Sequence, residues 1–372
     1  MSFVPFELER WQSTWENRVR HNISESGVHP LSIRELLELS GGDLAEFADL
    51  RLVYNQSDGT DELREAIAGL YPGATPDQVT VTLGSAEANF IACWTLIEPG
   101  DKVAIQTPVY MQTHGLAQNF GARVAEFSLR FERNWEPDPA EVAQAIGPDT
   151  KLVVVTNPNN PTGKVFSQAT RDLIVERARA ANAWLLVDEV YQGAELNGDT
   201  TPSFWGSYER VLIVNGFSKA YGLPGLRIGW VVGPQAFKQE VMQRHDYTTI
   251  GPSPASDYLA IRALSVRDQI LARTRGILNT NYPILEEWLR GFESLFEWRD
   301  PDCGAICLVR YRHRLSALEL VERVRADQSI LLVPGEHFQM PFHLRLGYGN
   351  ETSELRETLD DLREAFGTLL MD

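Results

Sequence analysis

Short apolar runs alternate with helix-like segments through the middle of the chain, and this alternation restricts the fold more than any other sequence feature. The clearest runs are residues 79–83, 102–106, 152–156, 184–188 and 211–214. They are rich in β-branched residues and apolar on both faces, which is typical of buried parallel strands. Segments with helical patterns, such as 86–97 and 168–182, lie between them. The pattern predicts an α/β fold with a mostly parallel sheet, in which ligands bind at the carboxyl ends of the strands.

The C-terminal third has a different pattern. Helical segments are predicted at 279–292 and 354–371, and short strands at 305–311, 330–333 and 343–346. Together with the N-terminal segment, these elements predict a second, smaller α+β domain. We therefore expect residues 1–40 to belong to the small domain, 41–275 to form the large domain, and 276–372 to complete the small domain.

Composition excludes several classes of partner. The 372 residues carry a formal net charge of −17, which argues against binding of nucleic acid or an anionic membrane surface. Neither a secretory signal nor a membrane-spanning apolar run is visible, so we expect a cytoplasmic protein. The three cysteines, Cys93, Cys303 and Cys307, are too few for a disulfide framework and fit a reducing compartment. No histidine or second cysteine pair accompanies Cys303 and Cys307, so we expect no metal site.

Lys219 is the residue that points most directly to a chemistry. It follows the predicted strand 211–214 inside a glycine-rich turn, with Ser218 before it and Arg227 eight residues later. An amine forms a Schiff base with an aldehyde, and a guanidinium grips two oxygens of a phosphate. Pyridoxal 5′-phosphate (PLP) carries both groups. The arrangement predicts a PLP site in which Ser218 adds a hydroxyl to the phosphate contacts.

Asp188 and Tyr191 follow the neighbouring predicted strand 184–188. A buried carboxylate beside the pyridine nitrogen of PLP keeps that nitrogen protonated, so that the ring withdraws electrons from the substrate. Tyr191, three residues later, can donate a hydrogen bond to the phenolic oxygen of the ring. An acidic turn after a strand is common in itself, and only its combination with Lys219 favours this interpretation.

The run 218–230 resembles the cofactor-lysine signature of class I and II aminotransferases, which are PLP enzymes of fold type I. Further motifs extend the resemblance in order from about residue 54 to residue 345. It implies a three-layer αβα large domain with a smaller α+β domain. It also implies that Lys219 forms the Schiff base and acts as the base, and that Arg227 pairs with the phosphate.

The resemblance assigns further cofactor contacts. It implies that Gly84, Ser85 and Ala86, at a predicted helix start, bind the phosphate, and that Tyr110 stacks on the pyridine ring. Asn160, in the turn 157–163, would contact the phenolic oxygen and the substrate, and the following Pro161 is a candidate for a cis peptide bond. One departure from the family pattern is Gly216, where many members carry a serine that helps to bind phosphate.

Substrate and partner contacts are implied in the same way. Arg345 corresponds to the arginine that binds the α-carboxylate of the substrate, and Gly27 to the glycine that lies over the substrate. Tyr54 corresponds to a tyrosine that reaches the phosphate of the other subunit. The resemblance therefore implies a homodimer with a shared active site.

For the reaction, we expect amino transfer from an L-amino acid to a 2-oxo acid, through a Lys219 Schiff base and pyridoxamine phosphate. The segments 22–31 and 246–249 resemble a capreomycidine synthase-like subgroup, so elimination, replacement or cyclisation on a substituted amino acid stays open. In that subgroup, Glu25 and His29 would be candidate substrate contacts. A PLP-sensing transcription regulator is disfavoured because the chain is acidic.

Overall fold

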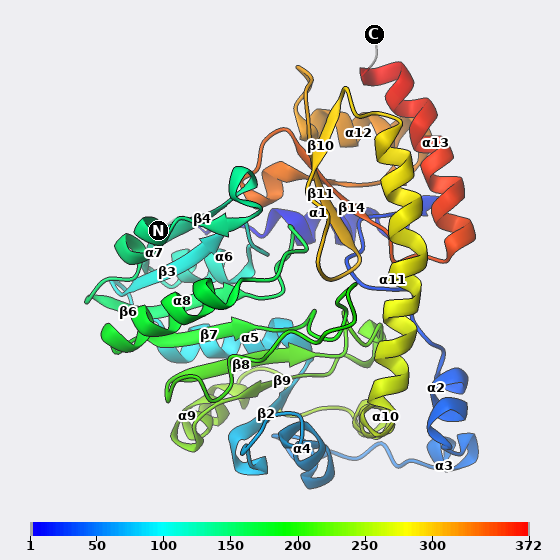
Figure 1. The fold of residues 1–372 in the computed structure, drawn as a ribbon. Coiled ribbons are helices and arrows are strands. Elements are labelled where there is room, and N and C mark those ends of the chain that lie inside the picture. Colours follow the sequence, from blue (N-terminus) through cyan, green and yellow to red (C-terminus); the bar gives the residue numbers. More distant parts are fainter. Residues whose placement is uncertain (1–2, 371–372) are drawn as a thin grey trace.

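The computed structural model describes residues 3–370 and is built around an eight-stranded sheet (Figure 1). The strands are β2 (Val79–Thr82), β3 (Lys102–Thr107), β4 (Arg123–Arg130), β5 (Glu136–Pro137), β6 (Thr150–Thr156), β7 (Trp184–Asp188), β8 (Val211–Gly216) and β9 (Gly229–Val232). Their order in the sheet is β2-β9-β8-β7-β6-β3-β4-β5. The pairs among β8, β7, β6, β3 and β4 are parallel, and β9 and β5 are antiparallel to their neighbours. The predicted mostly parallel sheet is confirmed.

Helices cover both faces of this sheet because alternate strand residues enter different cores. On β6, Leu152 and Val154 join one apolar cluster, and Val153 and Val155 join another. The first cluster includes residues of α5 (Gly84–Leu96), α6 (Gln112–Asn119) and α9 (Gln235–His245). The second includes residues of α4 (Asp61–Ala68), α7 (Pro139–Ala145), α8 (Gln168–Ala180) and α10 (Pro254–Ser265). The result is the expected three-layer arrangement.

A second, antiparallel sheet forms the upper part of the molecule in Figure 1. Its order is β10 (Phe296–Trp298), β11 (Ile306–Tyr311), β14 (His343–Gly347) and β13 (Val333–Pro334). The helices α11 (Arg267–Arg290), α12 (Ala317–Gln328) and α13 (Thr352–Leu370) pack with it. The N-terminal strand β1 (His21–Asn22) pairs in parallel with β12 (Ile330–Leu331), so the two ends of the chain meet here. The remaining N-terminal helices are α1 (Glu7–Trp15), α2 (Ile33–Ser40) and α3 (Leu44–Ala48).

Some element bounds differ from the expectation. The helix predicted at 279–292 begins twelve residues earlier, at Arg267, because Ile270, Leu271 and Leu278 extend its buried stripe. The proposed domain boundary at 275/276 therefore falls inside α11, and the division into domains stays a proposal. The predicted strand 330–333 is split into β12 and β13. The helix predicted at 354–371 is α13, and position 371 lies outside the described residues.

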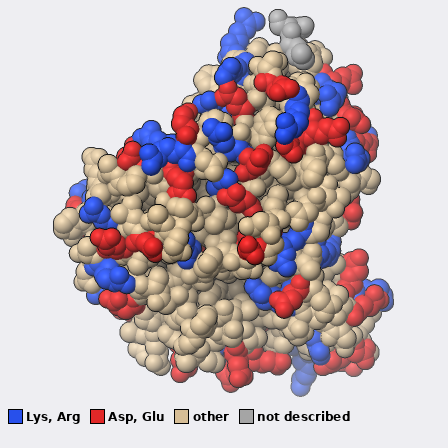
Figure 2. Space-filling model, viewed as in Figure 1, with Lys and Arg blue, Asp and Glu red and all other residues tan. Residues whose placement is uncertain are grey.

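Surface features agree with the acidic composition. Figure 2 shows acidic and basic side chains interleaved across the face in view. Within residues 3–370, no helix is both long and apolar enough to cross a membrane.

All three cysteines are buried free thiols, and burial raises the pKa of Cys93 to about 12. A thiol with a raised pKa is a weak nucleophile, so the cysteines act here as small apolar side chains.

Candidate active site

A cavity of about 300 Å³ opens at the carboxyl ends of the central strands. The strand register brings these ends together, with Thr156 opposite Asp188, Asp188 opposite Val214, and Gly216 opposite Gly229. Ten of the predicted site residues line the cavity: Ser85, Ala86, Tyr110, Asn160, Asp188, Tyr191, Ser218, Lys219, Arg227 and Arg345. Residues that lie up to 260 positions apart in the sequence thus face one space.

Lys219 lies in the turn that follows β8, beneath the N-terminal loop. Its carbonyl accepts a hydrogen bond from Gly222 N at 3.1 Å, which closes the turn. Gly27 crosses over it, and a Cβ atom at Gly27 would stand 3.1 Å from the Ser218 carbonyl oxygen and 3.8 Å from Lys219 Cδ. A larger residue at this point would press on the lysine, so the predicted position of Gly27 beside the reacting groups agrees with the geometry.

One end of the cavity is suited to a phosphate. Helix α5 starts at Gly84, and its N-cap position is Leu83, which has no polar side chain to cap the helix. Backbone N–H groups at such a helix start, next to the hydroxyls of Ser85 and Ser218, form an anion site. The guanidinium of Arg227 lies against Gly84, where a Cβ atom would be 2.5 Å from its Nη2. None of the carboxylates in residues 3–370 forms an ion pair with Arg227 in this structure, so its charge is available to an anion.

Two glycines allow this close packing. A Cβ atom at Gly229 on β9 would lie 2.4 Å from the backbone of Gly84 and Ser85, so the start of α5 rests directly on that strand. At Gly216, where the family often has serine, a Cβ atom would stand 3.0 Å from the Ile228 carbonyl oxygen. The departure from the family pattern therefore has a steric reason.

The opposite end presents a carboxylate. Asp188 accepts hydrogen bonds from Asn89 Nδ2 at 2.9 Å and from Val190 N at 3.1 Å. Burial raises the pKa of Asp188 to about 6, and these two donors oppose the rise. Tyr191 OH lies 2.9 Å from the hydroxyl oxygen of Ser26, a buried residue that also lines the cavity. Sequence reasoning missed both residues, because Asn89 belongs to no motif and the segment 22–31 indicated only Glu25, Gly27 and His29, not Ser26.

Arg345 on β14 is a buried cation, and only some of its N–H donors have a hydrogen-bond partner. Its side chain donates to Asn160 Oδ1 at 2.9 Å and to the Ser24 carbonyl oxygen. Its Nε has no hydrogen-bond partner among the described residues, and no carboxylate among them pairs with it. A buried guanidinium with unused donors fits a bound carboxylate. The peptide bond between Asn160 and Pro161 is cis, as expected.

Helix α1 forms a further wall of the cavity, with acidic residues that sequence reasoning did not predict. Glu9, Gln12 and Glu16 are spaced by three and four positions, which places them on one face of the helix, and all three line the cavity together with Glu25. Tyr110 OH donates to Glu9 Oε1 at 2.5 Å. Helical spacing alone would have revealed this face, but nothing in the sequence shows that the face meets the cavity.

The helix is anchored on both sides of the cavity. The side-chain amide of Asn119 on α6 bonds both the N–H and the carbonyl of Val4, at 2.8 and 3.0 Å. On the other side, Trp11 Nε1 donates to the Leu332 carbonyl at 2.8 Å. Figure 1 shows α1 between the large sheet and the smaller one. The acidic face is therefore held in place by both parts of the molecule.

Two predicted residues lie elsewhere. Tyr54 is 91% exposed and is not among the described residues that line the cavity of its own chain. His29 Nδ1 lies 2.9 Å from Arg273 Nη2 and 3.0 Å from Glu351 Oε1, on the outer side of the N-terminal loop. Of the two candidate substrate contacts in this loop, the structure thus brings Glu25 to the cavity and leaves His29 outside it.

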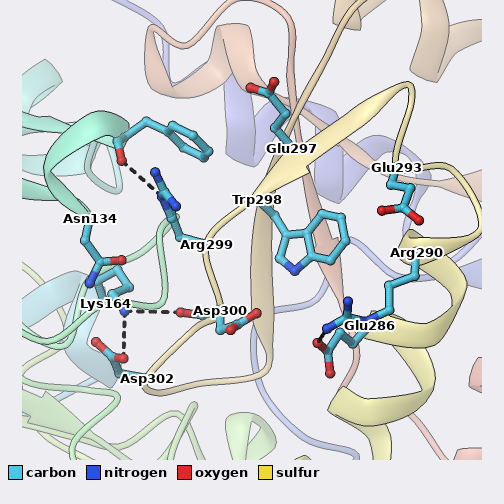
Figure 3. Close-up of a pocket in the computed structure, with 11 residues that line it drawn as sticks. Asn134, Lys164, Glu286, Arg290, Glu293, Glu297, Trp298, Arg299, Asp300 and Asp302 are labelled. Atoms are coloured by element: carbon cyan, nitrogen blue, oxygen red, sulfur yellow. Dashed lines mark hydrogen bonds and ion pairs between the residues drawn. The ribbon is translucent and has the colours of Figure 1, made fainter.

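A larger hollow, shown in Figure 3, lies beside β10 and the end of α11. Its volume is about 820 Å³, and most of its lining residues are charged. Lys164 Nζ pairs with Asp302 at 2.7 Å and Arg290 pairs with Glu286, as the dashed lines show. Because these charges satisfy one another at the surface, the hollow lacks the converging unused groups that mark the cavity at Lys219.

Comparison with known proteins agrees with this geometry. Residues 36–362 match the family described as aminotransferase class I and II. The chain belongs to this family. Its members depend on PLP, and the uncapped start of α5, the Arg227 guanidinium without an ion-pair partner among the described residues and the buried carboxylate of Asp188 fit the phosphate and the ring of that cofactor. PLP is therefore the cofactor of this protein.

Individual relatives differ in the reactions that their names describe. The chain is 32% identical to capreomycidine synthase of Streptomyces vinaceus, covering 97% of this chain and 93% of that protein. It is 28% identical to an aspartate aminotransferase of Thermotoga maritima, covering 84% and 82%. It is 29% identical to an arginine–pyruvate transaminase of Pseudomonas aeruginosa, covering 76% and 72%.

The similar solved structures also include both an aminotransferase and a cyclase. A PLP-dependent aminotransferase from Streptococcus suis superposes with a TM-score of 0.93 at 31% identity, covering 99% of both chains. A PLP-dependent cyclase, OrfR, superposes with a TM-score of 0.91 at 29% identity, covering 98% of this chain and 97% of that one. The family, the fold type I architecture and the cofactor are thus established. The relatives include both aminotransferases and cyclases, so the reaction has to be inferred from the residues of the cavity.

Proposed function

We propose that this enzyme transfers the amino group of an L-amino acid with a positively charged side chain to a 2-oxo acid. The observation that carries the proposal is the distribution of charge in the cavity. Arg345 supplies a cation from β14, and Glu9, Glu16 and Glu25 supply carboxylates from α1 and the N-terminal loop. An amino acid with a carboxylate and a cationic side chain complements both.

No cation of the described residues forms an ion pair with the carboxylates of this wall, although the charge of Lys219 acts on Glu16 and that of Arg345 on Glu25 and Glu9. Neither Glu16 nor Glu25 forms an ion pair with another described residue, and Glu9 accepts only the hydroxyl of Tyr110. Burial raises the pKa of Glu16, and the neighbouring charges of Glu25 and Glu9 raise it further. A bound ammonium or guanidinium would relieve this repulsion, whereas the side chain of aspartate would add to it. This charge pattern supports a cationic donor rather than a dicarboxylic one.

The cavity residues support the chemistry of amino transfer. When bound, PLP withdraws electrons from the α-carbon of the substrate and accepts its amino group. Arg345 would hold the α-carboxylate with its fork, assisted by Asn160. Lys219 Nζ, freed when the substrate amine takes its place, would remove the proton from the α-carbon. Asp188 would stay ionised opposite the ring nitrogen, and Tyr191 would donate to the ring oxygen.

We further propose that two chains share this site. Leu52, Val53 and Tyr54 form an exposed apolar run, and Tyr247 and Ile250 are exposed on a neighbouring loop. The two loops touch, because a Cβ atom at Gly251 would lie 3.0 Å from Ser57 Cα. An apolar patch of this kind marks an interface, and in a dimer Tyr54 would reach the phosphate of the partner subunit.

A second candidate reaction is elimination or cyclisation on a substituted cationic amino acid. The names of capreomycidine synthase and the cyclase OrfR suggest it. Glu16 supports it, because a half-buried carboxyl group with a raised pKa can move a proton on the substrate side chain. Such a group is not needed for amino transfer alone.

One experiment separates the two reactions. The PLP-loaded enzyme is mixed with arginine, ornithine, lysine, citrulline, norleucine or aspartate, without an acceptor. Arginine with a hydroxyl group on its β-carbon is added to the panel, because elimination needs a leaving group at that position. Amino transfer predicts one equivalent of the 2-oxo acid and conversion of the cofactor to its amino form, without free ammonia. Ammonia or a cyclic product with an unchanged cofactor would favour the second reaction. Absence of both products with every cationic amino acid would contradict the proposed function.

A further inference from the structure

Asn89 is a polar side chain in the apolar flank of helix α5. Its neighbours Ala88, Ile91 and Ala92 are fully buried, and Asn89 itself is 2% exposed. It is not among the described residues that line the cavity. The only hydrogen bond of its side chain in the described part of the chain runs from Nδ2 to Asp188 Oδ2 at 2.9 Å, and its Oδ1 has no partner there. A buried amide that makes a single contact, to a carboxylate, calls for a physical explanation.

The direction of the amide is fixed by charge. If the amide were flipped, Oδ1 would face the carboxylate oxygen and the two acceptors would repel each other. The N–H group of Val190 donates to the other oxygen of Asp188 at 3.1 Å. Each carboxylate oxygen therefore has one donor from the protein and keeps a further lone pair for a ligand. Asn89 and Val190 together orient the carboxyl group toward the cavity.

These donors oppose the effect of burial on Asp188. A carboxylate removed from water tends to take up a proton, and a donor directed at its ionised form counteracts that tendency. The hydrogen bond from Asn89 therefore lowers the pKa of Asp188, against the larger effect of burial. The other ionisable groups that interact with Asp188 are Lys219, Tyr110, Tyr191 and Glu189. Only Lys219 among these also favours the ionised form.

We propose that Asn89 is a positioning residue that keeps Asp188 ionised and thereby keeps the proton on the ring nitrogen of the bound cofactor. Without this donor, the proton shared between Asp188 and the ring nitrogen shifts toward the carboxyl group. The ring then withdraws electrons less strongly from the substrate. The inference rests on the proposed role of Asp188 and extends it to a residue outside the cavity.

The placement of Asn89 gives helix α5 two functions. Gly84 at its first position belongs to the phosphate end of the cavity, and Asn89 lies five residues later, about 7.5 Å along the axis. The same rigid helix therefore fixes the phosphate with its N-terminus and the charge at the ring nitrogen through Asp188. A helix that packs on β7, β8 and β9 provides a constant spacing for the two ends of one cofactor.

The test measures the proton directly. The holoenzyme is prepared with PLP labelled with ¹⁵N in the ring, and the ¹⁵N resonance of the bound cofactor is recorded. Asn89→Leu keeps the branched shape of the side chain, with a larger volume, and suits the apolar surroundings, and Asn89→Ala serves as a second variant that adds no volume. Ile91→Ala on the same helix is the control for a loss of packing. Asp188→Asn shows how far the resonance moves when the carboxylate is absent.

We expect the resonance of both Asn89 variants to move toward that of a neutral pyridine, in the direction of Asp188→Asn. We also expect kcat to fall at least about tenfold with little change in KM. The resonance of Ile91→Ala should match the wild type. If Asp188→Asn moves the resonance but the Asn89 variants do not, the inference is overturned. If Asp188→Asn itself has no effect, the proposed role of Asp188 is wrong as well.

Discussion

At the scale of single residues, the cavity holds charges that the folded protein alone does not neutralise. Arg345 is fully buried with an unused Nε, and Asp188 is buried with a pKa raised to about 6. Burying such groups lowers stability unless a partner compensates. The bound cofactor and substrate are the partners that the geometry indicates, so substitutions at these positions should affect folding and function in different directions.

Arg345→Lys should weaken the use of amino donors. A lysine supplies a point charge but not the fork, and it leaves Asn160 Oδ1 and the Ser24 carbonyl without their donors. We expect a loss of about 1.5–3 kcal/mol, which corresponds to roughly a ten- to hundredfold lower kcat/KM for the donor. Steady-state kinetics measure it, with Arg323→Lys on the surface of α12 as the control. Equal losses in both variants would refute the assigned role.

Asp188→Asn should stabilise the cofactor-free protein while weakening PLP binding. The pKa of Asp188 is about 6 in the folded protein and 3.8 in the unfolded chain, so ionisation of this carboxyl group lowers the free energy of unfolding. The loss of stability is complete above pH 6 and disappears as the pH falls below 3.8. At pH 7 this loss is about 3 kcal/mol. Asn89 can flip its amide to accept from the new side chain. Denaturant unfolding of both apoproteins at pH 5 and pH 7.5 tests this, and a variant less stable than the wild type at pH 7.5 would contradict it.

At the scale of elements, the sequence predicted the strands that have an apolar run and are followed directly by a motif of the cavity. The strands β3, β6, β7 and β8 each contain a short apolar run, and the motifs that follow them line the cavity. Strands β4 and β9 were not predicted, because β4 is partly exposed and β9 is a short run after a glycine-rich turn. The acidic face of α1 was missed because its function depends on which surface the helix meets, and that depends on tertiary contacts with Asn119 and Leu332.

Gly229→Ala should damage the phosphate end of the cavity. Its Cβ atom would lie 2.4 Å from the backbone of Gly84 and Ser85, so helix α5 would have to move away from β9. We expect PLP affinity to fall at least about tenfold and stability to fall by about 1–3 kcal/mol. Fluorescence titration of the apoprotein with PLP and thermal unfolding measure the two effects. Gly115→Ala on α6, where no atom lies within 4 Å of the added Cβ, should leave PLP affinity unchanged and should not lower stability, since alanine is the better helix former.

At the scale of the whole molecule, the N-terminal segment connects parts that are far apart in the sequence. Strand β1 pairs with β12, α1 bridges to α6, and Gly27 lies over Lys219. The cavity is thus enclosed by both ends of the chain and by the central sheet. In the proposed dimer, Tyr54 from the exposed run at Leu52 to Tyr54 would be added to the cavity of the second copy of the chain.

Leu52→Asp should dissociate the proposed dimer and lower PLP affinity with it. Leu52 is 87% exposed in the single chain, and a charge there would be buried without a partner in a dimer. Sedimentation measurements at micromolar concentration should show a dimer for the wild type and a monomer for the variant. Leu318→Asp on α12, outside the patch, should remain dimeric. A wild type that is monomeric with full PLP affinity would contradict the shared site.

The most direct test of the account compares two donors that differ only in charge. Arginine and citrulline have nearly the same shape, and kcat/KM is measured for each with the wild type, with Glu16→Gln and with Glu7→Gln, an exposed residue of α1 outside the cavity. We predict at least about a tenfold preference for arginine, equivalent to about 1.4 kcal/mol, which Glu16→Gln reduces and Glu7→Gln retains. Equal use of both donors by the wild type would contradict a cavity built for a cationic side chain.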